Sequence, residues 1–109
     1  MSGANLAVVT GGASGLGRAI SGHLLDAGWR VLFTYRSSVA EAEALEAAHP
    51  GRAHGIRCDL GRVEGRDALE ARARALGGLD LLVNNLGIYP EAWIEDIDTE
   101  LFEEVFTLT

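Results

Sequence analysis

Short apolar runs alternate with longer amphipathic segments along the chain. The apolar runs are rich in valine, leucine and aromatic residues, and glycine, proline or polar residues that favour turns follow them. This alternation is typical of βαβ units, in which helices join parallel strands and cover the sheet. The pattern therefore predicts an α/β protein with about four strands, expected at residues 5–10, 29–35, within 52–59 and at 79–84.

The first expected helix follows the first strand. Its apolar residues recur four positions apart, which places them on one face that can pack on a sheet. Gly28 then offers a C-terminal stop. The predicted face consists of Leu16, Ile20 and Leu24, with Ala19, His23 and Ala27 beside them.

Two further helices are expected between the remaining strands. Ser38 and Glu41 predict a capping box at the start of the second helix, in which each side chain satisfies a backbone N–H near the other. Residues 49–51 end that helix. The third is expected over residues 62–76, and another helical segment from about Asp98 onward. The apolar side of the third helix is predicted to hold Val63, Leu69, Ala73 and Leu76.

Length and charge narrow the class of protein. The chain has 109 residues, 48% of them hydrophobic, which is enough for one domain, and no second domain is expected. The formal net charge is −7, all nine basic residues are arginine, and no lysine is present. Residues 91–109 hold seven acidic side chains and no basic one. An acidic chain with dispersed arginines lacks the basic stripe that phosphate-backbone binding requires, so nucleic acid is not an expected partner.

Other features argue against metal, disulfide and membrane roles. Cys58 is the only cysteine, which excludes an internal disulfide and a thiolate zinc site and fits a reducing compartment. His23, His49 and His54 share no metal-ligand spacing on one element, so no metal site is expected. No signal peptide or membrane-spanning stretch is recognised. These features predict a soluble, cytoplasmic chain without a membrane partner.

The clearest chemical motif is the glycine-rich stretch at residues 10–17 (TGGASGLG), which follows a predicted strand and opens a predicted helix. Glycines let the backbone turn sharply and approach a pyrophosphate, and the N–H groups at a helix start carry partial positive charge. An anion can therefore be held here without a lysine. The alternative hypothesis is a glycine-rich turn that holds no ligand.

Four motifs together resemble the short-chain dehydrogenase/reductase family. The spacing Gly11-x3-Gly15-x-Gly17 after Thr10 is similar to that family's phosphate loop and differs from G-x-G-x-x-G. Residues 35–38 (YRSS) end the second strand, residues 58–60 (CDL) resemble the family's D-[VL], and residues 82–87 (LVNNLG) resemble its N-N-A-G.

The resemblance implies a Rossmann-type doubly wound parallel sheet, incomplete here, with residues 1–109 as the N-terminal, cofactor-binding part of a single domain. It also implies an NAD(P)-dependent oxidoreductase that transfers hydride between nicotinamide and a carbonyl or alcohol substrate.

The resemblance also implies a set of cofactor-binding residues. In the family, the Asp59 position contacts adenine, the Asn84 position helps to hold the sheet, and the backbone of residues 85–87 lies along a ribose. Leu86 replaces the usual alanine. The implied set is Thr10, Gly11, Ser14, Gly15, Leu16, Gly17, Tyr35, Arg36, Ser37, Asp59, Leu60, Asn85, Leu86 and Gly87.

The end of the second strand favours NADP(H) over NAD(H). A carboxylate there would accept from the ribose 2′-hydroxyl and repel a 2′-phosphate, whereas this chain has Tyr35 and then Arg36, whose guanidinium can bind phosphate. Ser37 and Ser38 can donate to the same group, although Ser38 is equally suited to cap a helix. Two alternatives remain. Arg36 can be a solvated loop residue, and the coenzyme specificity can be mixed, because Ser14 stands where some NADP-dependent members have a base.

The family's catalytic residues are not found in these 109 residues. The family needs a serine, a Tyr-x3-Lys pair and an asparagine. Here Val39 and Trp93 stand where a lysine would follow the two tyrosines, and Thr109 aligns with the asparagine. The chain alone is therefore expected to be inactive, with a carbonyl or alcohol substrate bound only in a complete protein. The fourth strand should form an exposed sheet edge able to associate with another copy or a partner. A non-catalytic nucleotide-binding or sheet-completing module is the alternative hypothesis.

Overall fold

A computed structural model describes residues 5–85. They form one four-stranded parallel sheet in the order β3-β2-β1-β4. This confirms the predicted α/β fold, with strand ends within two residues of the expected ones. The strands are β1 (Leu6–Thr10), β2 (Arg30–Tyr35), β3 (Ala53–Arg57) and β4 (Leu81–Asn84).

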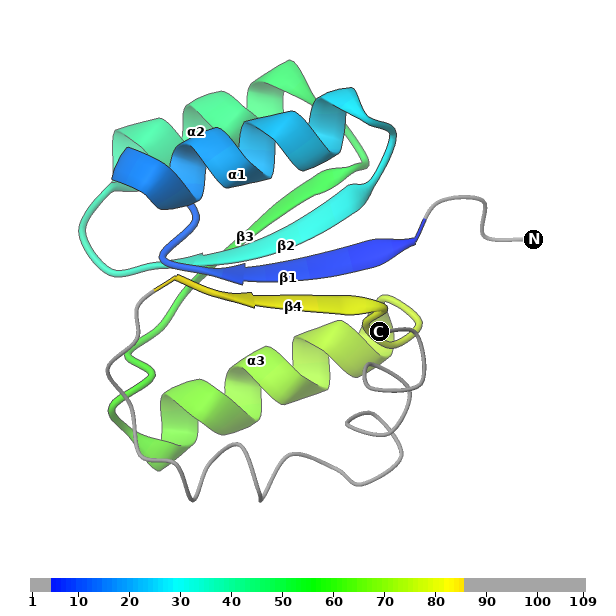
Figure 1. Cartoon of the computed structure of the whole chain (residues 1–109). Helices are drawn as coiled ribbons and strands as arrows, with labels where there is room; N and C mark the ends of the chain where they lie inside the picture. The colour runs from blue at the N-terminus through cyan, green and yellow to red at the C-terminus, as the bar shows by residue number, and fades with distance from the viewer. Residues whose placement is uncertain (1–4, 86–109) are drawn as a thin grey trace.

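Helices cover both faces of this sheet. α1 (Gly15–Asp26) and α2 (Val39–Ala48) lie on one face, and α3 (Val63–Ala75) lies on the other (Figure 1). The sheet is therefore doubly wound, as the resemblance implied.

Each face of the sheet has its own apolar cluster. Leu6 and Val8 of β1 point into the α3 cluster, whereas Ala7 and Val9 point into the α1/α2 cluster. Because both faces of the strand are covered, its sequence is continuously apolar instead of alternating. The α1/α2 cluster also contains Phe33, Leu25 and Ala42, and each of these is at most 1% exposed.

The predicted apolar face of α1 was wrong in part. Leu16 is 69% exposed, and Ala19, His23 and Ala27 are exposed as well, although Ile20 and Leu24 pack against the core. The buried positions of α1 are Gly17, Ser21 and Leu25. A Cβ atom at Gly17 would overlap the carbonyl oxygen of Gly11. The helix is so close to the loop that small residues, which hydrophobic spacing does not detect, form its inner face.

The same cause explains a second error in α3. Val63 was expected on the apolar side but is 56% exposed, whereas Leu69 and Ala73 are buried as predicted and Leu76 packs against them. Gly65 takes the inner position of the first turn, because a Cβ there would overlap the carbonyl oxygen of Asp59.

The predicted capping box at α2 was also wrong. Ser38 is the N-cap residue, but its side chain makes no capping hydrogen bond. Its backbone (φ −84°, ψ 56°) differs from the extended conformation that directs an N-cap hydroxyl toward the first turn.

The topology places a switch point at the carboxyl ends of β1 and β4. The chain proceeds from β1 to β2 and β3 on one side and then returns to add β4 on the other side. Such a switch point is where open α/β sheets bind ligands. Within residues 5–85, no helix is long and apolar enough to cross a membrane, and no group of His, Cys, Asp or Glu is arranged to hold a metal ion. The helix expected from about Asp98 lies outside the described residues.

Candidate functional site

The glycine-rich loop is held at its start by β2. Gly11 has a positive φ of 64°, and its N–H donates to Thr34 Oγ1 at 2.9 Å. The N–H of Gly12 donates to the Thr34 carbonyl at 3.1 Å. Thr34 is 1% exposed, so both of its loop contacts are shielded from water. A buried threonine of β2 thus orients the first turn of the loop, and no sequence motif pointed to it.

The middle of the loop is held against α1. Ser21 is buried and its hydroxyl donates to the Gly12 carbonyl at 3.1 Å. A Cβ at Gly12 would lie 2.6 Å from Phe33 Cβ and 2.7 Å from Ser21 Oγ, so only glycine fits. Ser21 was missed by sequence analysis because its role depends on contact between the helix and the loop.

The start of α1 has the properties of an anion site. Ser14 is an extended N-cap residue whose side chain makes no capping hydrogen bond, and the first turn carries no acidic residue. Gly15 has a φ of 56°, and a Cβ built there would meet nothing within 4 Å. Backbone N–H groups here carry partial positive charge toward open space. The start of α1 is therefore open to an anion, as a pyrophosphate site at a helix N-terminus requires.

The loop is joined to the end of β4 across the switch point. The Asn85 N–H donates to Thr10 Oγ1 at 3.0 Å, and Asn85 Nδ2 lies 3.4 Å from the Gly11 carbonyl oxygen. Thr10 and Asn84 also pair in register between β1 and β4. Sequence positions more than seventy residues apart are thus brought together. Leu86 and Gly87, the rest of this predicted motif, lie outside the described residues.

A pocket of about 180 Å³ connects the loop to the end of β2. Gly11 and Ser14 line it from the loop, and Tyr35, Arg36 and Ser37 line it from β2 and the turn that follows. The structure therefore brings together the two motifs from which a bound dinucleotide was predicted.

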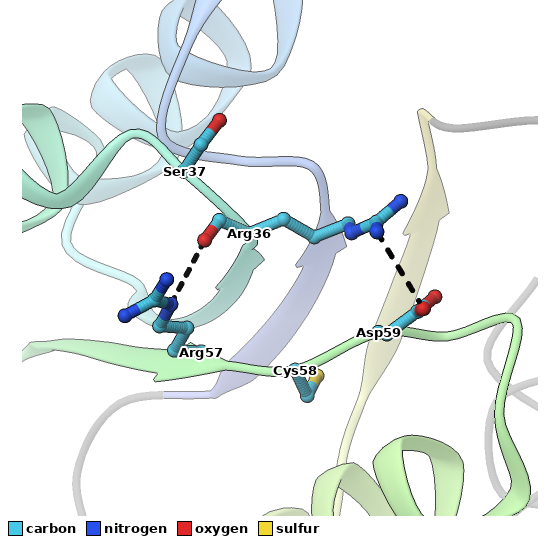
Figure 2. A pocket seen from close by; sticks show the side chains of 5 residues that line it. All are labelled: Arg36, Ser37, Arg57, Cys58 and Asp59. Carbon is cyan, nitrogen blue, oxygen red and sulfur yellow. Dashed lines mark hydrogen bonds and ion pairs between the residues drawn. The ribbon is translucent and has the colours of Figure 1, made fainter.

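A larger neighbouring pocket of about 620 Å³ extends from the end of β2 to the end of β3. Figure 2 shows its lining residues. The Arg36 side chain extends toward Asp59, and Arg57 lies on the other side of the Arg36 carbonyl. Arg57 Nε donates to that carbonyl at 2.9 Å. Arg57 was not predicted as a site residue. Its only sequence signal was its place two residues before Asp59, at the end of the third strand.

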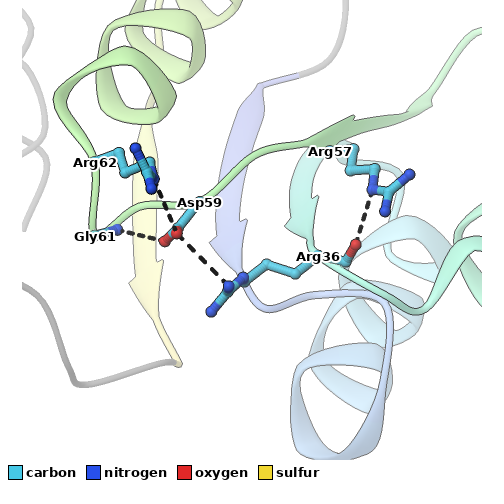
Figure 3. A network of polar contacts seen from close by, with 5 residues as sticks. All are labelled: Arg36, Arg57, Asp59, Gly61 and Arg62. Carbon is cyan, nitrogen blue, oxygen red and sulfur yellow. Dashed lines mark hydrogen bonds and ion pairs between the residues drawn. The ribbon is translucent and has the colours of Figure 1, made fainter.

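Asp59 is the centre of the polar contacts shown in Figure 3. Its Oδ1 accepts from the Gly61 N–H at 2.9 Å, and its Oδ2 lies 3.6 Å from Arg36 Nη2 and 3.9 Å from Arg62 Nε. The Arg36 and Asp59 side chains are 72% and 36% exposed. Arg36 is thus positioned over the pocket by an exposed ion pair, which is weak in water.

Cys58 lies in the wall of both pockets and is half-buried. Burial, and then the negative charge of Asp59, raise the pKa of its thiol to about 11. The thiol is therefore protonated near neutral pH and contributes a neutral surface to the site.

Two predicted site residues take other positions. Leu60 is 2% exposed and packs in the α3 cluster, and Leu16 projects its side chain from the start of α1. Neither lines the two pockets between the loop and the arginines. The remaining predicted residues within 5–85 surround the loop, the end of β2 and the start of the β3–α3 turn.

The fold defines a Rossmann-type α/β protein with a glycine-rich loop at the switch point of its sheet. The family model described as short chain dehydrogenase matches residues 5–109, and the chain belongs to that family. This confirms the resemblance inferred from the four motifs.

Known relatives are longer than this chain. An uncharacterized oxidoreductase of Methylorubrum extorquens is 40% identical over 105 residues, covering 93% of this chain and 42% of the relative. The cis-1,2-dihydrobenzene-1,2-diol dehydrogenase of Pseudomonas putida is 36% identical over 107 residues, covering 93% of this chain and 38% of that enzyme. A solved short-chain dehydrogenase from Streptomyces avermitilis superposes with a TM-score of 0.70 at 30% identity, covering 95% of this chain and 44% of that structure.

Proposed function

We propose that residues 1–109 are the NADP(H)-binding part of an oxidoreductase that transfers hydride between nicotinamide and a carbonyl or alcohol substrate. The observation that carries this proposal is the hollow that runs from the open start of α1 to Arg36. Family membership supports the reaction class. In this proposal the nicotinamide gives hydride to a carbonyl or accepts it from an alcohol, and the residues of this chain bind and orient the coenzyme.

Each part of the site has a separate task in coenzyme binding. The N–H groups from Gly15 onward bind the pyrophosphate, and Thr34 keeps the preceding turn in place. Tyr35 stands where an NAD-specific member would carry an acidic side chain, so nothing at that position repels a 2′-phosphate. Arg36 supplies a guanidinium that can form charge-assisted hydrogen bonds with that phosphate.

Titration of the purified chain with NADPH and NADH tests this proposal. Wild-type protein should bind NADPH more tightly, and Arg36→Gln should weaken NADPH binding by about tenfold, which corresponds to one charge-assisted hydrogen bond, with little effect on NADH. The matched control is Arg72→Gln, which removes an arginine from the last turn of α3. Absence of binding of both coenzymes would contradict the proposed function, and a preference for NADH would contradict the role of Arg36.

A further inference from the structure

Arg57 lies beside the pocket that Arg36 enters, although it comes from a different strand. It is the last residue of β3 and is in register with Tyr35, the last residue of β2. The Cys58 N–H donates to the Tyr35 carbonyl at 3.0 Å, so the two strand ends stay paired up to the pocket. Both arginines therefore line one pocket, and Figure 2 shows their guanidinium groups on opposite sides of the Arg36 carbonyl.

The Arg57 side chain is anchored through only one of its nitrogens. Within residues 5–85, the one hydrogen bond of the Arg57 side chain runs from its Nε to the Arg36 carbonyl oxygen. A guanidinium has five N–H donors, so four remain on Nη1 and Nη2. An arginine that is already oriented by its Nε loses less conformational entropy when it binds an anion.

Arg36 is engaged differently. Its head group points toward Asp59, at 3.6 Å, and Asp59 is also within 3.9 Å of Arg62 (Figure 3). Arg36 and Arg62 lie near the Asp59 carboxylate, and Arg57 contacts the Arg36 carbonyl. These three guanidinium groups and one carboxylate leave an excess of two positive charges around this pocket. A phosphate monoester near neutral pH carries close to two negative charges and matches that excess.

The two pockets form a continuous path from the loop to Arg57. Arg36, Ser37 and Cys58 line both of them. A dinucleotide with its pyrophosphate at the loop has its adenosine ribose near the end of β2, so a group on the ribose 2′-oxygen faces the larger pocket.

We propose that Arg57 is a specificity-determining residue that binds the 2′-phosphate of NADP(H) together with Arg36. This inference rests on the proposed function. Arg36 exchanges part of its interaction with Asp59 for the phosphate, whereas Arg57 keeps its Nε bond to the Arg36 carbonyl and supplies the second guanidinium from the pocket wall. The base that is missing at Ser14 is thus replaced by an arginine from β3.

The test compares NADPH and NADH affinity in the full 109-residue chain by calorimetric titration. Arg57→Gln should weaken NADPH binding by about tenfold and NADH binding less than twofold, because only NADPH carries the 2′-phosphate. Arg57→Lys keeps the charge but not the fork, so its NADPH/NADH ratio should fall between those of wild type and Arg57→Gln. Arg72→Gln controls for loss of one positive charge elsewhere and should leave the ratio unchanged.

The results separate this inference from the proposed function. If wild-type chain binds neither coenzyme, both are overturned. If wild type prefers NADPH but Arg57→Gln weakens both coenzymes equally, Arg57 only supports the Arg36 carbonyl and its specificity role is overturned, while the proposed function stands. The same conclusion follows if Arg57→Gln behaves like Arg72→Gln. If Arg57→Gln does not fold, Arg57→Lys decides by the ratio alone.

Discussion

The ion pair between Arg36 and Asp59 illustrates how single residues act at this site. The Arg36 side chain is 72% exposed and that of Asp59 is 36% exposed, so water screens their attraction and it adds little to folding stability. Its value lies in keeping a flexible arginine over the pocket while leaving it free to change partner. Arg57 differs because its Nε is held by a backbone carbonyl, which fixes the side chain more firmly.

Cys58 provides a prediction at the residue scale. Because burial and the charge of Asp59 raise the pKa of its thiol to about 11, alkylation by iodoacetamide should be slow near neutral pH and should accelerate up to about pH 11. The control is the same chain unfolded in guanidinium chloride, whose thiol should titrate near the ordinary value of 9.0. A rate that levels off below pH 9 in the folded chain would contradict the raised pKa.

At the scale of elements, the contact between α1 and the loop is made by small residues. Gly17 faces Gly11 and Asn85, and Ser21 faces Gly12. This close approach fixes the helix start at the proposed anion site. The first helix is thus placed by two small residues, Gly17 and Ser21, and Leu25 is the large apolar one among its buried residues.

Substitution of Gly17 tests this contact. Gly17→Ala should destabilise the chain by about 1–3 kcal/mol and weaken NADPH and NADH binding equally, because the added Cβ would overlap the Gly11 carbonyl and displace the loop. Chemical denaturation and coenzyme titration measure the two effects.

Gly22→Ala is the matched control in the same helix. No atom lies within 4 Å of a Cβ at Gly22, so this change should stabilise the chain by about 0.5–1 kcal/mol through higher helix propensity. Equal effects of the two alanine substitutions would show that helix propensity, and not the contact with Gly11, controls position 17.

At the scale of the whole molecule, two covered sheet faces and one switch point place the candidate site at the carboxyl ends of the strands. β3 and β4 are the outer strands in the described part of the chain. In β3 the edge is partly protected, because Glu46 Oε2 accepts from the Gly55 N–H at 2.9 Å. Association through β4 remains a prediction, since Leu81, Leu82 and Val83 are only half-buried there.

Binding and catalysis should be separable in this 109-residue chain. At a free concentration one hundred times its Kd, NADPH should stabilise the fold by about 2.7 kcal/mol, because it binds only the native state. NADPH consumption with an added carbonyl compound should stay at the level of a protein-free control, because these 109 residues contain no lysine and hence no Tyr-x3-Lys pair. Turnover above that control would contradict the prediction, and a melting temperature unchanged by NADPH would contradict binding.

The amino-acid sequence alone was sufficient for the order of elements, the parallel sheet and the place of the glycine-rich loop. These features depend on local properties: continuous apolar runs for covered strands, glycine where the backbone turns sharply, and motif spacing along the chain. The errors at Leu16 and Val63 arose where glycine, rather than an apolar side chain, faces the core. The capping-box prediction was wrong because the residue type of Ser38 does not determine its backbone angles.

The sequence by itself determined the family, the position of the loop and the role expected of Arg36. Only the tertiary structure showed that Thr34 and Ser21 hold the loop, that Asn85 joins it across the switch point, and that Arg57 shares a pocket with Arg36. The physical reason is that local spacing specifies strands and turns, whereas these contacts depend on which strand ends become neighbours in the sheet. That neighbour relation places a second arginine, unremarkable in the sequence, beside the site proposed for a 2′-phosphate.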